Sequence, residues 1–226
     1  GQAMRHNYPR MRNVIAISSY LERYYRARGC SSVRVPPTLD VLNREWSTAP
    51  MVTDGRLKLV YAGTPGKKDL LGPMLQGLQM VDPSGSRLEL EVIGMDHAAL
   101  QRVRETHHVT NAATVAIGRV SRETAMAHVS RAAFVPLLRS DARYAHAGFP
   151  TKLVESMSLG TPMICNLTSD IGDHVVDGET GIVVDGSDAG SFAIALERVA
   201  AMSTDPAAKP PTDNQNLLQW VRDMAA

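Results

Sequence analysis

The stretch from residue 147 to residue 166 holds the side chains with the clearest chemical potential. It begins with a turn at Gly148 and Pro150, continues as a short helix that carries Lys152 and Glu155, and ends in a buried strand. Backbone N–H groups and the positive end of the helix dipole make a helix N-terminus attractive to anions. Lys152 and Glu155 are three residues apart, so they share one face of that helix. A cation and a hydroxyl-binding carboxylate beside an anion-binding turn indicate a sugar-nucleotide site.

A second candidate anion site follows a predicted strand at residues 57–62. Gly63 and Thr64 open a turn that leads to Lys67 and Lys68 at the start of a helix. A lysine ammonium on its flexible stem can neutralise a diphosphate there. The turn is not a Walker loop, because no Gly-Lys-Ser/Thr sequence occurs in it. A solvated basic turn is the alternative interpretation.

Short apolar runs alternate with amphipathic segments along most of the chain. Such alternation is typical of an α/β protein whose parallel sheet is covered by helices on both faces. The pattern predicts strands at residues 13–18, 32–35, 57–62, 88–93, 114–117, 133–138, 163–166 and 181–184, a turn or short helix at 169–176, and further helices at 20–28, 69–81, 98–106, 121–130, 187–202 and 214–225. Residues 36–56 show no sustained period and are interpreted as a connection at a domain boundary.

Three glycines each end a predicted strand. Open parallel sheets bind ligands beyond the carboxyl ends of their strands. We therefore expect Gly63, Gly94 and Gly118 to face the same crevice as the turn at Gly148. The alternative is that these glycines only terminate strands.

Composition argues against several classes of protein. The net charge is +1, so no overall field favours nucleic acid or a membrane surface. The two cysteines, Cys30 and Cys165, make no disulfide framework, which favours a cytoplasmic protein. No apolar run approaches the roughly 20 residues that a membrane-spanning helix needs. The histidines, including the adjacent His107 and His108, lack the spacing of a metal site, so no metal is expected.

The segment around Glu155, Gly160 and Pro162 resembles the E-A-M-A-x-G-x-P-V-I signature of retaining GT-B glycosyltransferases, the large family 4 group. Other segments resemble further motifs of that family in the same order: Gly63 with Lys67 and Lys68 the donor phosphate loop, 92–94 the next strand end, 117–121 the loop that touches the base, and 177–184 a later glycine motif. The turn Gly-Phe-Pro-Thr-Lys at 148–152 is closer to a polysaccharide or capsule-type branch. The resemblance covers roughly residues 12–202.

The resemblance implies a Rossmann-like, doubly wound parallel sheet that forms one half of a GT-B fold. Residues 1–35 would be the remnant of the end of an N-terminal domain, and residues 36–56 the interdomain linker. Residues 57–202 would form the nucleotide-sugar-binding domain, followed by a linker and a C-terminal helix at 203–226. Residues that act on the acceptor would lie outside this chain, and the fragment is expected to be inactive alone. Peripheral membrane association of the full enzyme is compatible with this arrangement.

The resemblance also assigns roles to residues. Lys68, assisted by Lys67 or Lys152, would be the catalytic cation that stabilises the leaving diphosphate, and Glu155 would hold the ribose hydroxyls. The remaining donor-binding residues would be Gly63, Thr64, Gly118, Arg119, Val120, Gly148, Phe149, Pro150 and Thr151. The implied reaction moves a hexosyl group from a nucleotide-diphosphate sugar to an acceptor hydroxyl, with no other cofactor and no obligate metal.

Two departures from the family pattern leave alternatives open. Ala147 stands where the family often has a first glutamate, and Pro150 lacks the N–H of the usual glycine. Ala147 favours a non-catalytic scaffold or nucleotide-sugar-binding module, whereas Lys68 and Glu155 argue against one. A GT-B fold epimerase would need acids and histidines between two domains, and the chain shows no such set. Arg139 and Arg143 precede the turn and could bind a donor phosphate or an acidic sugar, or lie in a solvated loop.

Overall fold

The computed structural model describes residues 8–39, 55–66, 68–110 and 113–204. The strands are β1 (Asn13–Ala16), β2 (Ser31–Arg34), β3 (Leu57–Ala62), β4 (Leu88–Ile93), β5 (Thr114–Gly118), β6 (Val135–Leu137), β7 (Met163–Cys165) and β8 (Gly181–Val183). The α-helices are α1 (Ser19–Arg26), α2 (Leu71–Val81), α3 (His97–Thr106), α4 (Arg122–Ser130), α5 (Arg143–Ala147), α6 (Thr151–Ser158) and α7 (Ala189–Thr204), with 3-10 turns at Tyr8–Met11 and Ile171–Asp173.

The strands from β3 to β8 form one parallel array. β3 pairs with β4 and β4 with β5, while β6 pairs with β7 and β7 with β8. A parallel bridge between Leu59 and Phe134 joins β3 to β6, so the order is β5-β4-β3-β6-β7-β8. This is the doubly wound order of a Rossmann-like sheet, in which the winding direction reverses between the first and fourth strands. The predicted fold class is confirmed, and the reversal lies between β3 and β6.

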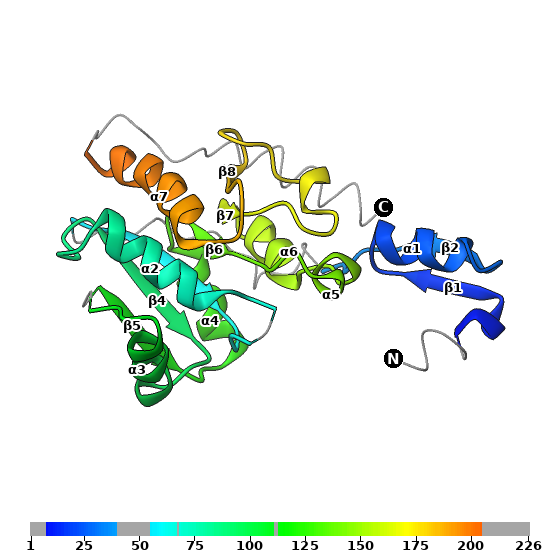
Figure 1. Cartoon of the computed structure of the whole chain (residues 1–226), viewed down its shortest axis with the longest axis horizontal. Coiled ribbons are helices and arrows are strands. Elements are labelled where there is room, and N and C mark those ends of the chain that lie inside the picture. The colour runs from blue at the N-terminus through cyan, green and yellow to red at the C-terminus, as the bar shows by residue number, and fades with distance from the viewer. Residues whose placement is uncertain (1–7, 40–54, 67, 111–112, 205–226) are drawn as a thin grey trace.

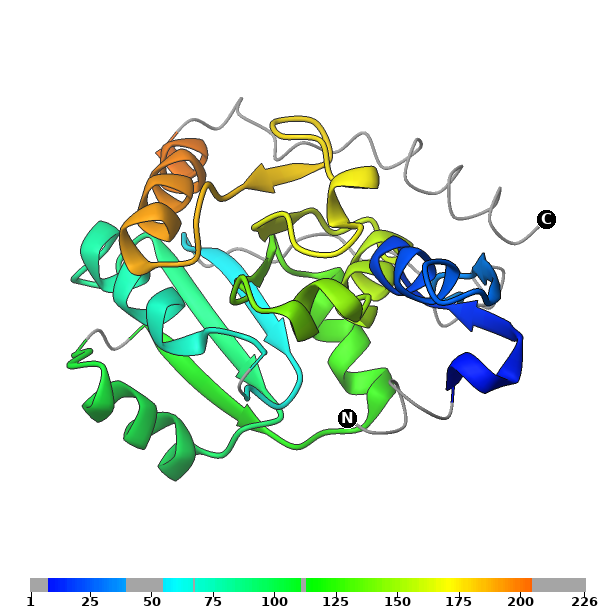
Figure 2. The ribbon, with the colours of Figure 1, turned by 45° about the vertical axis from the view of Figure 1, so that its right-hand side comes forward.

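Helices cover both faces of this sheet, as expected for strands with nearly continuous apolar runs (Figures 1 and 2). One core contains the buried side of α2, α3 and α7 and includes Tyr61, Leu75 and Phe192. The other contains α4 and α6 and includes Val60 and Leu153. The sheet therefore holds the ends of β3, β6 and the start of α6 in a fixed relation.

The N-terminal segment forms a separate small unit, seen at the right of Figure 1. Its two parallel strands, β1 and β2, flank α1, whose start is capped by the Ser18 side chain. The Ser18 hydroxyl also donates to the carbonyl of Ala147 at 2.8 Å. Asp170 accepts from the Ser19 backbone N–H at 2.8 Å and from Arg34 Nη1 at 3.2 Å. The unit is thus attached beside the turn that precedes α6.

One local prediction was wrong, and one helix was missed. Helix α2 begins at Leu71 instead of residue 69, because Asp69 forms a backbone bridge with Arg139 and the Leu70 N–H donates to Leu138. Helix α5 was not predicted. The predicted helix at 214–225 and most of the connection at 36–56 lie outside the described residues.

Asp82 joins α2 to β4, and its carboxylate accepts the backbone N–H groups of Ser86, Arg87 and Leu88 at 3.2, 2.8 and 2.9 Å. Burial alone would raise the pKa of Asp82, but these N–H groups outweigh it and lower the pKa. We expect Asp82→Ala to lower the free energy of unfolding by about 2 kcal/mol, because three donors lose a charged acceptor. Chemical denaturation at neutral pH measures this loss.

The same measurement against pH tests the mechanism at Asp82. A lowered pKa means that the stabilisation is present above the unfolded-state pKa and is lost as the pH falls below about 4. The difference between wild type and Asp82→Ala should therefore shrink in acid. Ser84→Ala is the control, because it removes one hydroxyl partner of Asp82 and leaves the backbone bonds in place. A difference that persists unchanged in acid would contradict the assignment.

Candidate functional site

A cavity of about 310 Å³ opens at the point where the winding of the sheet reverses. Its volume falls at the lower end of the range for small-molecule sites. Its walls come from the loop after β3, the end of β6 and the turn into α6, and are formed by Thr64, Gly66, Lys68, Asp69, Leu137, Arg139, Gly148, Phe149, Pro150, Thr151 and Lys152. Crevices beyond the carboxyl ends of strands at such a reversal are where open α/β sheets bind ligands.

The two anion-binding segments expected from the sequence meet in this cavity. Thr64 and Lys68 come from the first, and Lys152 comes from the second with the turn that precedes it. Lys68 is exposed, whereas Lys152 is half-buried. Lys67 lies outside the described residues. Lys152 is consequently the more firmly placed of the two described lysines.

Asp69 links these two segments and was not singled out in the sequence. Its Oδ2 accepts from Lys152 Nζ at 2.8 Å and from the Tyr61 hydroxyl at 2.7 Å. Its Oδ1 lies 4.0 Å from Nε of Arg139. Burial alone would raise the pKa of Asp69, but the Lys152 ammonium, with Tyr61 and Arg139, lowers it. Asp69 is therefore a carboxylate at neutral pH.

Lys152 reaches Asp69 because Gly63 has no side chain. A Cβ on Gly63 would lie 2.9 Å from Cε and 3.0 Å from Nζ of Lys152. The ammonium also sits 4.9 Å from the centre of the Tyr61 ring, within the range of a cation–π contact. Gly63 thus contributes to the site by leaving room for the end of the Lys152 side chain.

Arg139 is buried, with only 4% of its surface exposed. Its Nη1 lies 3.4 Å from Oγ1 of Thr168 and 3.5 Å from the carbonyl of Gly148, so these hydrogen bonds are long. Burial lowers the pKa of Arg139, with Asp69 opposing that effect. Arg143, by contrast, is exposed. Of the two arginines that precede the turn, Arg139 is therefore the one that lines the cavity.

Glu155 lies one helical turn beyond Lys152 on α6 and is half-buried. Burial raises its pKa, and the charges of Arg122 and Lys152 oppose that rise. Arg122 begins α4, directly after the β5 loop. The charges of α4 and α6 thus both act on Glu155. Arg122 was not predicted as a neighbour.

Gly63, Gly94 and Gly118 lie close together, but none of them is among the residues that line the cavity with Gly148, so the shared crevice expected from the sequence is not formed by these residues. The Gly63 N–H donates to the carbonyl of Ile93, and the Gly94 N–H donates to the carbonyl of Gly118 at 2.7 Å. Gly118, Arg119 and Val120 do not line the 310 Å³ cavity. Arg119 and Val120 are exposed, and this loop leads into Arg122, whose charge acts on Glu155. The donor-binding residues predicted from the sequence thus fall in two adjacent groups instead of one.

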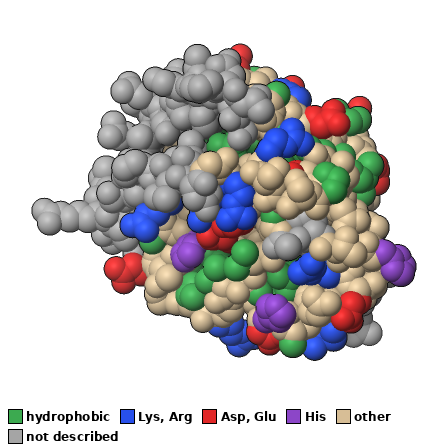
Figure 3. Space-filling view, turned by 90° about the vertical axis from the view of Figure 1, so that its left-hand side faces the viewer, with side chains coloured by type: hydrophobic (Ala, Val, Ile, Leu, Met, Phe, Trp, Pro, Cys, Tyr) green, Lys and Arg blue, Asp and Glu red, His purple; other side chains and the backbone are tan. Residues whose placement is uncertain are grey.

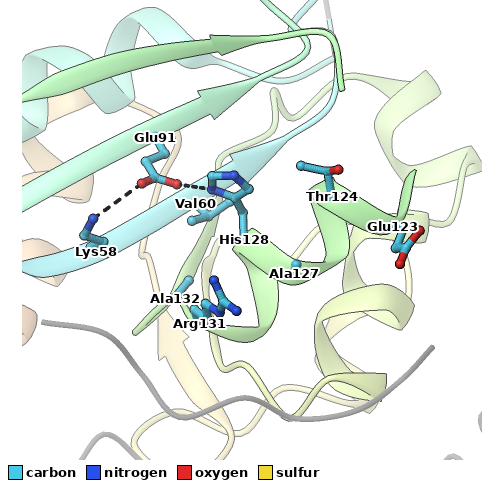
Figure 4. Close-up of a pocket in the computed structure, with 9 residues that line it drawn as sticks. All are labelled: Lys58, Val60, Glu91, Glu123, Thr124, Ala127, His128, Arg131 and Ala132. Atoms are coloured by element: carbon cyan, nitrogen blue, oxygen red, sulfur yellow. Dashed lines mark hydrogen bonds and ion pairs between the residues drawn. The ribbon is translucent and has the colours of Figure 1, made fainter. Parts of the chain in front are cut away.

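A larger cavity of about 510 Å³ lies elsewhere, between the middle of the sheet and α4 (Figure 4). In it, Nδ1 of His128 lies 2.6 Å from Oε2 of Glu91, and Lys58 Nζ lies 3.6 Å from Oε1 of Glu91. The Glu91 carboxylate is thus already held by Lys58 and His128. The cavity does not lie at the carboxyl ends of the strands, so it is a weaker candidate for the ligand site.

The charges of the described residues do not mark a second ligand site on the face shown in Figure 3. On the face shown in Figure 3, cationic and anionic side chains are interspersed, as the net charge of +1 suggests. Among the residues described, no three His, Cys, Asp or Glu side chains gather as metal ligands. Within the same residues, no helix is long and apolar enough to cross a membrane.

Residues 56–202 match the family of group 1 glycosyl transferases. The match spans more than half of the chain, and the protein belongs to this family. Sugar transfer is therefore the activity of its class. No curated protein sequence matches the chain.

Solved structures share the fold at low sequence identity. Sucrose-phosphate synthase from Thermosynechococcus elongatus superposes with a TM-score of 0.72 at 18% identity, over 94% of this chain and 54% of that one. HepE of Anabaena gives 0.70 at 13% identity, over 94% and 59%. The lipopolysaccharide outer core galactosyltransferase WaaB gives 0.64 at 18% identity, over 93% and 60%. The chain thus has the α/β fold of a GT-B glycosyltransferase half and spans between 54% and 60% of these three proteins.

Proposed function

We propose that the chain is the donor-binding half of a glycosyltransferase that transfers a hexosyl group, with retention, from a nucleotide-diphosphate sugar to an acceptor hydroxyl. The setting would be cytoplasmic synthesis of a polysaccharide or glycoconjugate. The observation that carries the proposal is the cavity at the reversal of the sheet, where Lys68, Arg139 and Lys152 face one space and Glu155 follows on the same helix as Lys152.

The chemistry proposed is stabilisation of charge where it develops. As the bond to the sugar breaks, negative charge grows on the diphosphate, and preorganised cations and N–H groups lower the energy of that state. Lys68 and Lys152 would supply the cations, and the start of α6 would supply N–H groups and its dipole. Glu155 would accept hydrogen bonds from the ribose hydroxyls, and the loop Gly118–Val120 would receive the base. No metal ion or other cofactor is needed in this proposal.

The division of the chain is also a proposal. Residues 1–35 would be the end of an N-terminal domain, 36–56 the interdomain linker, 57–202 the donor-binding domain and 203–226 a linker with a C-terminal helix. The greater length of the similar structures supports it. Acceptor-binding residues would then lie outside this chain, so we expect it to bind donor nucleotides without transferring sugar. Robust glycosyl transfer by this chain alone would contradict that expectation.

Nucleotide binding tests the proposal directly. One structure of HepE holds UDP and glucose and another holds UDP-glucose, so UDP is the first probe, with GDP and ADP beside it. At a ligand concentration of 100 times Kd, binding to the native state stabilises it by about 2.7 kcal/mol, which appears as a rise in Tm. We expect a saturable rise with one of the three nucleotides. No rise with any of them would favour a non-catalytic scaffold.

A further inference from the structure

The proposed anion cavity contains a carboxylate. Among the residues that line it, Lys68, Arg139 and Lys152 are cationic, and Asp69 is the acid. An acid in an anion site repels the ligand and should weaken binding, since like charges brought together cost free energy. We therefore expect the Asp69 carboxylate to assist anion binding in another way that offsets this repulsion.

The contacts of Asp69 indicate such a role. Its backbone is fixed against the end of β6 by the bridge to Arg139, and its Oδ2 is anchored by the buried Tyr61 hydroxyl at 2.7 Å. The same oxygen accepts from Lys152 Nζ at 2.8 Å. Lysine has a long, flexible stem, and Asp69 holds its ammonium over Gly63 at one place in the cavity.

The hydrogen bond to Asp69 leaves the Lys152 ammonium able to bind an anion as well. An ammonium has three N–H donors. One donates to Asp69, and the others can donate to phosphate oxygens in the cavity.

We propose that Asp69 is a positioning residue that holds the Lys152 ammonium ready for the diphosphate of the donor, an inference that rests on the proposed function. Asp69 then helps anion binding through Lys152 by more than it opposes binding through its own charge. The alternative is that Asp69 only compensates charge or fixes the loop before α2. The two accounts predict opposite signs for the removal of its charge.

The experiment measures the Kd of inorganic pyrophosphate and of UDP, GDP and ADP by calorimetry at one ionic strength. Charge compensation alone predicts that Asp69→Asn binds pyrophosphate more tightly. Positioning predicts weaker binding, by roughly tenfold, in spite of the gain in positive charge. Asp185→Asn, which removes an exposed carboxylate, is the matched control and should change Kd little.

A double-mutant cycle then tests whether Asp69 acts through Lys152. Lys152→Ala should weaken pyrophosphate binding by a similar factor. In the Lys152→Ala background, Asp69→Asn should no longer weaken binding and should tighten it, because only the repulsion remains to be removed. Asp69→Glu, which keeps an acceptor, should recover part of the wild-type affinity. If Asp69→Asn does not fold, Tyr61→Phe removes only the hydroxyl that anchors Asp69 and should weaken binding in the same direction.

The outcomes separate the two levels of the proposal. If the wild-type chain binds neither pyrophosphate nor any of the nucleotides, the proposed function fails and this inference fails with it. If the wild type binds but Asp69→Asn binds equally well or more tightly, the positioning role alone is overturned. Equal weakening by Asp69→Asn with and without Lys152 would also overturn it.

Discussion

Replacing Glu155 with Gln is expected to weaken nucleotide binding by roughly 30-fold, the equivalent of about 2 kcal/mol. Glu155 is half-buried on α6, with Arg122 and Lys152 close enough to oppose the effect of burial on its pKa. In the proposed site its carboxylate accepts hydrogen bonds from two ribose hydroxyls, and charged acceptors make the stronger hydrogen bonds. The amide keeps the shape but loses the charge and one acceptor. Calorimetric titration with UDP, GDP and ADP measures the change.

Pyrophosphate provides the internal control for Glu155, because it has the phosphates without the ribose. We expect its Kd to be nearly unchanged in Glu155→Gln. Glu197→Gln, at an exposed acid on α7, is the matched surface variant and should leave the binding of both ligands unaffected. A parallel loss of pyrophosphate and nucleotide binding would assign Glu155 to the phosphates, and no loss of either would remove it from the site.

The pH dependence of nucleotide binding follows from the direction of the shift at Glu155. Burial raises the pKa of its carboxyl, so the carboxylate is protonated at a higher pH than an exposed glutamate would be. Affinity that depends on the charged form should therefore fall as the pH is lowered, and should begin to fall above the usual glutamate range. Glu155→Gln should lack this fall.

The sequence predicted the parts of the site that depend on local pattern. The strand at 57–62 and the glycine after it follow from an apolar run that ends in a turn, and the structure places both as expected. Lys152 and Glu155 both lie on α6 as predicted, and their spacing of three residues places them on one face of that helix. These features need no knowledge of distant contacts.

The remainder of the site depends on tertiary contacts that no local pattern encodes. Asp69 comes directly after two lysines, and the sequence pattern assigned it to the start of a helix. Its backbone instead pairs with Arg139, which is far away in the sequence, so α2 begins only at Leu71. Arg139 is buried, and local composition could not distinguish it from the exposed Arg143. The charge of Arg122 acts on Glu155 because α4 and α6 cover the same face of the sheet.

The close approach of β3 and β4 at their carboxyl ends predicts the largest effect on stability. Gly94 has φ of +96°, and a Cβ there would lie 2.7 Å from the carbonyl oxygen and 2.9 Å from the carbonyl carbon of Gly63. Backbone atoms cannot move aside as the end of a flexible side chain can. Gly94→Ala should therefore suffer both backbone strain and a steric clash, and lose about 4 kcal/mol of unfolding free energy, since each contributes on the order of 1–3 kcal/mol.

Gly118→Ala separates the two causes. Gly118 also has a positive φ, of +80°, but a Cβ there would meet no atom within 4 Å. It should lose only the cost of a left-handed conformation, roughly 1–2 kcal/mol. Chemical denaturation of both variants measures the difference, which isolates the clash with Gly63. Because Gly63 lies against the end of the Lys152 side chain, a displaced Gly63 should also weaken pyrophosphate binding in Gly94→Ala where that variant remains folded. Equal stability of the two variants would contradict the predicted clash, since it would mean that β3 and β4 can separate at this end without cost.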